Sequence, residues 1–219
     1  MREELAALQD NHTWDIVPCP SSAKPIGCKW VFSVKLKADG SLDRYKARLV
    51  ALGNRQEYGF DYEETFAPVA KMTTIRTVLA IAASHSWPLY QFDVKNAFLH
   101  GDLKEEVYMR LPQGIAGASI GDCARLRRSL YGLKQAPRAW FENFRDALLH
   151  LQFTQSASDP SMFLHRSSDV ITVLLVYVDD IIISGTDSGM ITHLQASLHE
   201  SFHLKDLRPL TYFFGLEVH

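Results

Sequence analysis

The sequence predicts an α+β fold in which an antiparallel β-sheet is backed by helices. Residues 170–178 and 181–185 are apolar, β-branched runs joined by a short connection, which is typical of a buried hairpin. Residues 26–36 and 44–52 alternate apolar and basic side chains around an Asp-Gly turn, which predicts a second hairpin. Three further segments repeat apolar residues at helical spacing and predict helices: 71–84, 137–151 and 190–202.

The second hairpin is expected to have two different faces. One face should pack Val31, Val34 and Leu36, or their neighbours, against the core, while the other carries lysines and arginines. The turn between the strands is placed at residues 38–41.

The rest of the chain is assigned from local signals. An amphipathic pattern that ends near Asn11 predicts a short helix, and the prolines and serines of residues 13–23 predict a connector. Residues 53–68 read as irregular and acidic, and residues 112–121 as a glycine-rich loop. Pro137 suits the first turn of a helix, because a missing N–H is tolerated there. Short strands are predicted at 89–94, 107–109, 162–164 and 212–218.

Length and composition restrict the class of protein. The 219 residues suffice for one substantial core, or for a main domain with a smaller lobe. The apolar run 170–183 is too short for a membrane span and is interrupted by two aspartates, so we expect no membrane partner. No apolar segment of a signal peptide follows the first residues. The odd number of cysteines, without metal-ligand spacing, fits reduced intracellular thiols: Cys19, Cys28 and Cys123.

The net charge of −2 does not by itself indicate nucleic-acid binding, but the basic residues are unevenly distributed. They gather in residues 24–55 and again in residues 125–145, with few acids in either stretch. Two basic blocks in a nearly neutral protein suggest surfaces that attract phosphate. The alternative, which holds without other evidence, is that these side chains only solvate strands and helices.

An acidic pair lies in the middle of the apolar hairpin. Asp179 and Asp180 are expected in the connection between its strands, where an ordinary turn would prefer Asn-Gly or Asp-Gly. Two like charges 4 Å apart repel by about 4 kcal/mol at an intermediate dielectric constant, unless a cation lies between them. Spacing alone leaves two interpretations open, a metal site and a solvated acidic turn.

A third acid, Asp93, stands at the end of another apolar strand. A single aspartate there is usually a helix cap. An antiparallel sheet with two helices behind it would bring Asp93 to the same end as Asp179 and Asp180. Three carboxylates favour Mg²⁺, and basic blocks nearby favour phosphate, so the reaction class that fits is phosphoryl transfer with two metal ions.

Several sequence blocks resemble one known family. Tyr177-Val178-Asp179-Asp180 resembles the Tyr-X-Asp-Asp signature of reverse transcriptases. Other blocks, in the same order along nearly the whole chain, resemble the copia-type retrotransposon branch: Lys-Ala-Arg-Leu-Val at 46–50, Glu-Thr-Phe-Ala-Pro-Val at 64–69, Phe-Asp-Val-Lys-Asn-Ala-Phe-Leu-His-Gly at 92–101, and Leu-Tyr-Gly-Leu-Lys-Gln-Ala-Pro-Arg-Ala-Trp at 130–140.

The resemblance implies an RNA-directed DNA polymerase with a right-hand fold. Residues 1–88 would be mainly fingers, with an N-terminal helix and connector. Residues 89–219 would be mainly palm, with 107–135 partly in the fingers. The implied partners are dNTPs and a primer on an RNA or DNA template, and the implied cofactors are two Mg²⁺ ions, with Mn²⁺ as a substitute.

The resemblance also assigns roles to single residues. Asp93, Asp179 and Asp180 match the catalytic, metal-binding carboxylates, and the Val94 carbonyl would add a ligand. Phe98 matches the position that blocks a ribose 2′-hydroxyl. Arg48 matches the residue that holds the triphosphate, and Lys46 is the second candidate for that role. The resemblance further assigns three residues to the nucleotide pocket: Tyr131, Gly132 and Lys134. It assigns four residues to the primer or template: Tyr177, Pro137, Phe214 and Gly215.

Structural roles are the alternative for several of these residues. Phe98 in the core, Lys134 at the start of a helix and Gly132 in a turn would each explain the residue type without a ligand. Leu52 departs from the family pattern, since many relatives have lysine there, which lowers the expected affinity on the phosphate side.

The ends of the sequence also depart from the family pattern. The chain stops at His219, where the thumb is expected, and no ribonuclease H segment is present, so we expect a truncated fragment of a retrotransposon polyprotein. The alternative is an inactive remnant or a weak nucleic-acid-binding module, because much affinity for nucleic acid comes from extended phosphate contact. The family implies action inside the cell, in cytoplasmic virus-like particles or in the nucleus. The sequence does not give the oligomeric state.

Overall fold

The computed structural model describes residues 1–37, 39–115, 119–202, 204–205 and 208–218. Part of the predicted turn, Ala38, and part of the predicted loop, residues 116–118, lie outside this set. The chain forms two compact units: Met1–Phe66 with Phe98–Trp140, and Ala67–Ala97 with Phe141–His219. Residue 88, where the fingers and palm were expected to divide, lies within the second unit.

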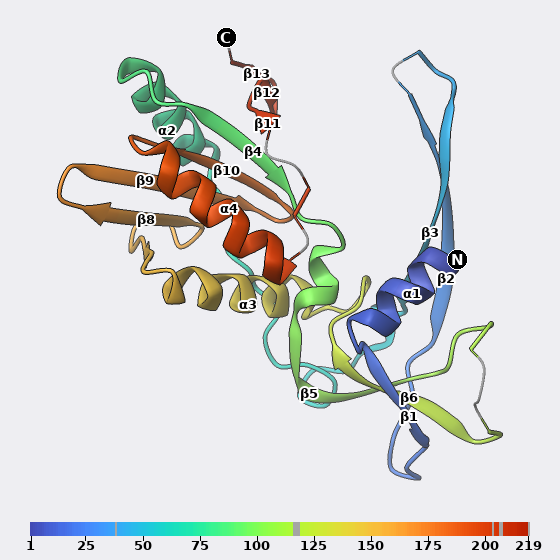
Figure 1. Ribbon diagram of the computed structural model, residues 1–219. Coiled ribbons are helices and arrows are strands. Elements are labelled where there is room, and N and C mark those ends of the chain that lie inside the picture. The colour runs from blue at the N-terminus through green and yellow to red at the C-terminus, as the bar shows by residue number, and fades with distance from the viewer. Residues whose placement is uncertain (38, 116–118, 203, 206–207, 219) are drawn as a thin grey trace. The chain divides into compact units, whose positions relative to one another are not determined.

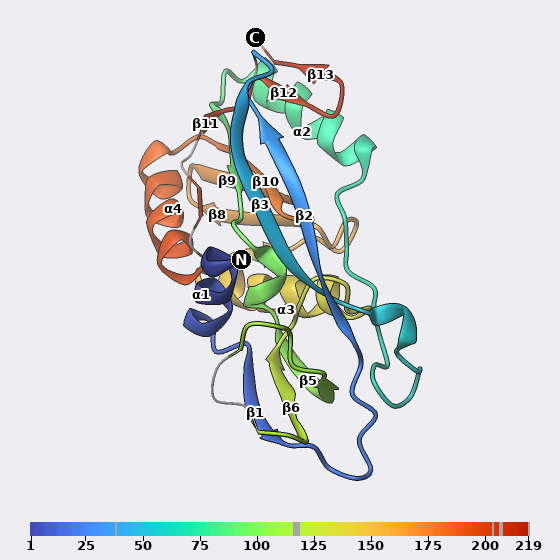
Figure 2. The ribbon, with the colours of Figure 1, turned by 90° about the vertical axis from the view of Figure 1, so that its right-hand side faces the viewer.

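The first unit combines a helix, a small sheet and a long hairpin. Its three-stranded antiparallel sheet has the order β1-β6-β5, and β2 pairs with β3 in a separate two-stranded ribbon (Figures 1 and 2). The elements are α1 (Arg2–Asp10), β1 (Trp14–Pro18), β2 (Cys28–Leu36), β3 (Leu42–Ala51), β5 (Asp102–Met109), β6 (Asp122–Arg128) and the 3₁₀ helix Gly53–Arg55.

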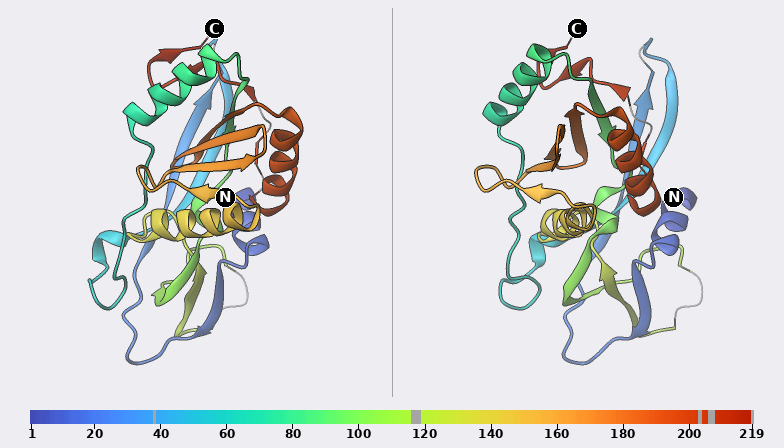
Figure 3. Two further views of the ribbon diagram at one scale, coloured as in Figure 1. Left: turned by 90° about the vertical axis from the view of Figure 1, so that its left-hand side faces the viewer. Right: turned by 60° about the vertical axis from the view of Figure 1, so that its left-hand side comes forward.

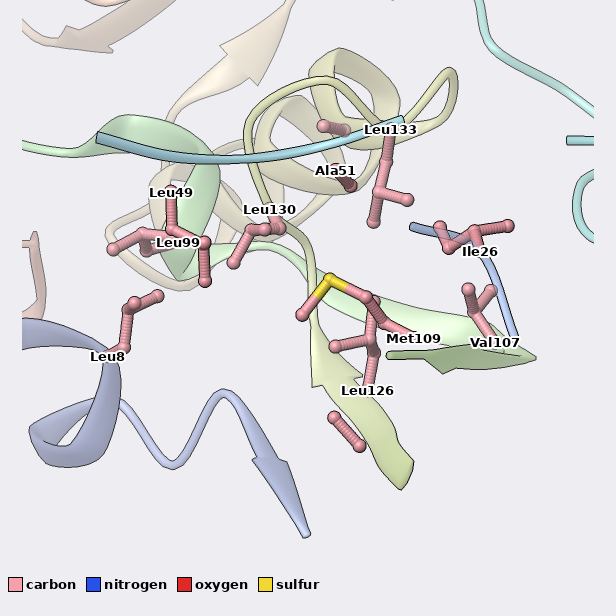
Figure 4. Close-up of a cluster of buried hydrophobic side chains, with 12 residues drawn as sticks. Leu8, Ile26, Leu49, Ala51, Leu99, Val107, Met109, Leu126, Leu130 and Leu133 are labelled. Atoms are coloured by element: carbon pink, nitrogen blue, oxygen red, sulfur yellow. The ribbon is translucent and has the colours of Figure 1, made fainter. Parts of the chain in front are cut away.

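Apolar side chains from all these parts form one core cluster (Figure 4). Leu8 of α1, Leu49 of β3 and Leu99 are each at most 1% exposed and belong to it. Because the cluster includes residues of β5, β6 and the 130–136 segment as well, it fixes the base of the hairpin to the small sheet and to the start of helix α3 (Ala136–His150).

The predicted connector at residues 13–23 is wrong over its first part. Residues 14–18 form strand β1, which pairs with residues 122–126 of β6, also unpredicted. Pro18 ends β1 at the edge of the sheet, where the missing N–H breaks no ladder. The partner strand lies more than a hundred positions away, so local turn signals outweighed a pairing that the local sequence does not show.

The β2–β3 hairpin is confirmed, but the expected burial of its apolar face is not. The register places Val34 opposite Tyr45 and Phe32 opposite Ala47 on one face, with Trp30 and Leu49 nearer the core. Phe32 is 67% exposed and Tyr45 is 77% exposed. Val31 pairs with Arg48 and therefore lies on the basic face. The ribbon extends beyond the core, so only its base is covered.

The second unit is built on a six-stranded sheet in the order β11-β4-β10-β9-β8-β7, and each of these pairings is antiparallel. The predicted apolar hairpin is confirmed as β9 and β10, in the middle of the sheet (Figure 1). The strands are β4 (Leu89–Asp93), β7 (Thr154–Gln155), β8 (Met162–Ser167), β9 (Val170–Tyr177), β10 (Asp180–Gly185) and β11 (Arg208–Pro209).

Helices cover both faces of this sheet (Figure 3). Helix α2 (Met72–Ser84) packs Ile75 and Val78 against Val173, Leu175 and Ile182. On the opposite face Leu174 pairs with Phe163, whose ring meets that of Phe141 on α3 (Ala136–His150). The Phe144 ring of α3 also meets Phe202 at the end of α4 (Ser188–Phe202). The predicted helices and the α+β class are thus confirmed. No helix in the described part of the chain is long and apolar enough to cross a membrane.

The predicted strand at 212–218 is instead a hairpin. Tyr212–Phe213 (β12) pairs with Leu216–Glu217 (β13) through a turn at Phe214 and Gly215. Both turn residues have positive φ, 45° and 84°, as a tight two-residue hairpin turn requires. The apolar run concealed the turn, because only the glycine in it is a turn residue by composition.

Candidate active site

The three aspartates meet at one end of the six-stranded sheet. Asp93 is the last residue of β4, Asp180 is the first of β10, and the two are direct partners across the ladder. Asp179 lies in the two-residue connection before Asp180, and its carbonyl accepts a hydrogen bond of 2.9 Å from the Val94 N–H. Backbone pairing therefore brings together the strand ends that carry the acids.

The connection between β9 and β10 has an unusual backbone. Val178 has φ 59°, a region that β-branched residues rarely adopt. Tight hairpin turns with positive φ at this position normally use glycine. Such a residue costs about 1–3 kcal/mol and persists only where the surrounding structure enforces it, often at functional sites. Here the flanking strands, β9 and β10, pair in the middle of the sheet, and this pairing enforces the backbone conformation of Val178.

The two neighbouring aspartates differ in their surroundings. Asp179 is exposed, whereas Asp180 is partly buried and accepts a 2.8 Å hydrogen bond from the Gln91 side chain. Burial raises the pKa of Asp180, and the charges of Asp179 and Asp93 raise it further, against the opposing effect of the Gln91 hydrogen bond. The three carboxylates thus repel one another.

A lysine from the C-terminal part of the chain adjoins Asp93. The Lys205 ammonium lies 3.7 Å from a carboxylate oxygen of Asp93, with both side chains about half exposed. The Lys205 N–H donates to the Asp93 carbonyl at 3.1 Å. Sequence reasoning missed both Lys205 and Gln91. Gln91 lies in the predicted strand 89–94 but is neither apolar nor acidic, and Lys205 lies outside every predicted element and motif.

The oxygen donors at this end of the sheet suit a hard cation such as Mg²⁺. Within the described residues, no three His, Cys, Asp or Glu side chains already form a closed metal site. Mg²⁺ does not need one, since it keeps several waters and binds through one or two carboxylates plus substrate phosphates. A divalent cation would also remove the repulsion that Asp93 and Asp179 exert on Asp180. The residues therefore fit Mg²⁺ chemically.

An aromatic groove adjoins Asp180 in the same unit. Its volume is about 590 Å³, and Asp180 and Gln91 line it together with Met72 and the 212–215 turn. The Tyr177 ring lies 4.3 Å from the Phe214 ring, centre to centre. Three of the predicted primer or template residues, Tyr177, Phe214 and Gly215, thus gather beside the acids, whereas Pro137 belongs to the other unit.

Three predicted nucleotide-pocket residues are stacked in the first unit. The Arg48 guanidinium lies 4.7 Å from the centre of the Tyr131 ring. The Tyr131 and Phe98 rings pack edge to face, with their centres 5.1 Å apart. The Arg48 Nε atom is buried and has no hydrogen-bond partner. The cation–π contact orients the guanidinium without using its N–H donors.

Two other predicted pocket residues are engaged in internal contacts. The Lys134 ammonium donates to the Tyr62 hydroxyl at 3.0 Å and to the Gln56 carbonyl at 3.3 Å. The Gln56 side chain also bonds the Lys134 N–H and the buried Gln135 amide. Gly132 has φ 91°, and a Cβ there would lie 2.2 Å from the Ala51 carbonyl oxygen. Both residues therefore make structural contacts within this unit. No role was predicted for Gln56, which lies outside the quoted motifs, or for Gln135, which lies inside the motif at 130–140.

The first basic block forms an open, positively charged face. The register places five basic residues on one face of the β2–β3 ribbon: Lys29, Lys35, Arg44, Lys46 and Arg48. Burial lowers the pKa of Lys46, and the charges of Arg48, Lys35 and Arg44 lower it further. Among these five residues, only Arg44 has a carboxylate of the described residues within 4 Å, that of Asp43.

The second basic block does not form such a surface. Arg125 pairs with Glu106, Arg127 with Asp15 and Arg128 with Asp102, at 2.6–3.4 Å. Arg138 pairs with Glu105 at 2.5 Å. The acids come from β1 and β5, distant in sequence, so the local charge count concealed the neutralisation. The prediction of a phosphate-attracting surface at residues 125–145 is therefore wrong.

Comparison with known proteins identifies the family of this chain. Residues 11–219 match the family described as reverse transcriptase (RNA-dependent DNA polymerase). Over its full length the chain is 49% and 48% identical to the retrovirus-related Pol polyproteins from transposons RE2 and RE1 of Arabidopsis thaliana, and 46% identical to that from transposon TNT 1-94 of Nicotiana tabacum. It spans 15–17% of the length of these relatives. The chain therefore belongs to the reverse transcriptase (RNA-dependent DNA polymerase) family, in its copia-type branch.

Proposed function

We propose that this chain is the nucleotide-adding core of an RNA-directed DNA polymerase. It would join a dNTP to the 3′-hydroxyl of a primer on an RNA or DNA template by two-metal phosphoryl transfer. The observation that carries the proposal is the direct pairing of Asp93 with Asp180, with Asp179 in the adjoining turn. In this assignment the six-stranded sheet belongs to the palm and the β2–β3 ribbon to the fingers.

The acids supply the oxygen ligands of this reaction. Asp93, Asp179 and Asp180, with the Val94 carbonyl, would hold two Mg²⁺ ions, for which Mn²⁺ can substitute. When bound, such a pair of ions lowers the pKa of the attacking hydroxyl and stabilises the departing pyrophosphate. Gln91 orients the Asp180 carboxylate through its 2.8 Å hydrogen bond. The enforced turn at Val178 fixes where Asp179 stands relative to Asp180.

The basic face and the aromatic stack serve the incoming nucleotide. Arg48 and Lys46 would bind the triphosphate, since a guanidinium suits phosphate and the Arg48 Nε–H has no partner within the described residues. Phe98, held against Tyr131, would exclude a ribose 2′-hydroxyl by its bulk. Gly132 and Lys134 would support this pocket from behind, since their own contacts fasten the 131–135 segment to the 51–62 segment.

The aromatic groove beside Asp180 would receive the primer end. Tyr177 and Phe214 offer ring faces to bases or sugars, and Gly215 allows the tight turn that presents Phe214. Pro137 opens helix α3 and shapes the segment assigned to the template.

Primer extension on an RNA template, with dNTPs and Mg²⁺, tests the proposal. Asp179→Asn should reduce incorporation by about a hundredfold or more, because several kcal/mol of metal-dependent stabilisation are lost. Asp169→Asn, an exposed aspartate in the turn before β9 of the same sheet, is the matched control and should retain incorporation.

Two results would contradict the proposal. If the unmodified chain incorporates nothing at high protein concentration and low salt, it is an inactive remnant. If incorporation survives Asp179→Asn, the site lies elsewhere.

A further inference from the structure

Helix α1 carries a buried acid that the proposed reaction does not use. Glu4 is 7% exposed, whereas its neighbour Glu3 is exposed. Leu8, one helical turn after Glu4, is 1% exposed and lies in the core cluster with Leu49 of β3 (Figure 4). The face of α1 that carries Glu4 and Leu8 therefore docks on the base of the β2–β3 ribbon.

The carboxylate of Glu4 is bound to the backbone of β3. The Leu49 N–H donates to Glu4 Oε1 at 3.2 Å. Leu49 directly follows Arg48, the predicted triphosphate ligand, in the strand. One acid on α1 is thus fastened to the backbone of β3, the strand that also carries Arg48 and Lys46.

The charge of Glu4 acts on that face. Burial raises the pKa of Glu4, and the Leu49 hydrogen bond and the positive charges of Arg48 and Lys46 oppose this rise. In return, the charge of Glu4 raises the pKa of Lys46. Among the described residues, Glu4 forms no ion pair with a lysine or arginine within 4 Å. Its charge therefore acts on Arg48 and Lys46 at longer range.

We propose that Glu4 is a positioning residue whose fixed negative charge weakens the hold of Arg48 and Lys46 on phosphate, so that helix α1 sets the triphosphate affinity. The inference rests on the proposed function for the identity of the ligand. The charge of Glu4 lowers by one unit the net positive charge that a phosphate group meets as it approaches the basic face. Moderate affinity would favour release of the pyrophosphate product.

Calorimetric titration of the protein with dTTP, at low and at moderate salt, tests this inference. Glu4→Gln keeps an acceptor oxygen for the Leu49 N–H and removes only the charge. It should bind dTTP about threefold to tenfold more tightly, and its affinity should fall more steeply with salt. Glu3→Gln removes the same charge from an exposed position of the same helix and should leave the affinity unchanged.

The outcomes separate this inference from the proposed function. If Arg48→Ala does not weaken dTTP binding, the proposed nucleotide site is wrong, whatever Glu4 does. If Arg48→Ala weakens binding but Glu4→Gln binds dTTP equally or less tightly than the unmodified protein, Glu4 is only an anchor of α1 and the inference is overturned. Thermal unfolding of each variant confirms that the protein compared is folded.

Discussion

Charged residues that are neighbours in sequence differ in burial and in hydrogen bonding. Asp179 and Asp180 are neighbours in sequence, but only Asp180 is partly covered and hydrogen-bonded by Gln91. Glu3 and Glu4 differ in the same way on helix α1. The sequence motif singles out only the pair of Asp179 and Asp180. In both pairs the structure shows which member is held by its surroundings.

The buried charge of Glu4 predicts a pH-dependent difference in stability. The folded-state pKa of Glu4 lies above the ordinary value of 4.5, so its ionisation costs folding free energy as the pH rises above that value. Glu4→Gln should therefore be more stable than the unmodified protein near pH 7, and the difference should shrink to zero as the pH falls below about 4.5. Urea denaturation across this range measures it. A stability difference that is the same at every pH would contradict the prediction.

The ion pair between Arg138 and Glu105 predicts a large effect of a single substitution. Both side chains are nearly buried, 11% and 12% exposed, and one polar atom of each lacks a hydrogen-bond partner. Glu105→Gln should destabilise the protein by about 3–5 kcal/mol, because it leaves the guanidinium charge uncompensated. Denaturation by urea gives the value.

The pair between Arg127 and Asp15 is the matched control. It is similarly short, 2.6 Å, but its side chains are 64% and 41% exposed. Asp15→Asn should cost less than about 1 kcal/mol. Equal losses for the two substitutions would show that burial does not decide the strength of these pairs.

At the scale of elements, close contact between two chain segments depends on glycine. Gly132 has positive φ, and its added Cβ would press on the Ala51 carbonyl. Gly40 also has positive φ, 81°, but nothing lies within 4 Å of the place of a Cβ. Gly132→Ala should destabilise by more than 2 kcal/mol, roughly, and Gly40→Ala by about 1 kcal/mol. Thermal unfolding measures both, and similar melting temperatures for the two variants would refute the close approach.

The β2–β3 ribbon predicts that its outer apolar residues do not stabilise the fold. Phe32→Ser should change the free energy of unfolding by less than about 0.5 kcal/mol, because that side chain is 67% exposed. Leu49→Ala, in the same ribbon but fully buried, should cost about 2–5 kcal/mol. Chemical denaturation compares them, and a large loss for Phe32→Ser would mean that the outer ribbon is packed.

Periodicity and turn signals were sufficient for some elements and not for others. The apolar hairpin of β9 and β10 and helices α2, α3 and α4 have strong local patterns and were predicted. Strand β1 and the hairpin of β12 and β13 were not, since the first depends on a distant partner and the second on a turn within an apolar run. The meeting of Asp93 with Asp180 followed from strand ends, but the roles of Gln91, Lys205 and Glu4 depend on contacts that no local pattern encodes.

At the scale of the whole chain, the chemistry is divided between the two compact units. All three catalytic candidates, Asp93, Asp179 and Asp180, lie in the second unit, and the open basic face with Arg48 lies in the first. Each unit holds its own functional residues in place. Strand pairing and the turn at Val178 hold the acids, and the ring of Tyr131 holds Arg48. The chain spans about a sixth of its relatives' length.

The most direct test of the central claim is the location of the metal ions. Crystals grown with primer–template, a dNTP and Mn²⁺ would give anomalous difference density at each bound ion. The account predicts two peaks at the strand ends, within coordination distance of the carboxylates of Asp93, Asp179 and Asp180. Ordered substrate with Mn²⁺ bound away from these carboxylates, or absent from them, would contradict it.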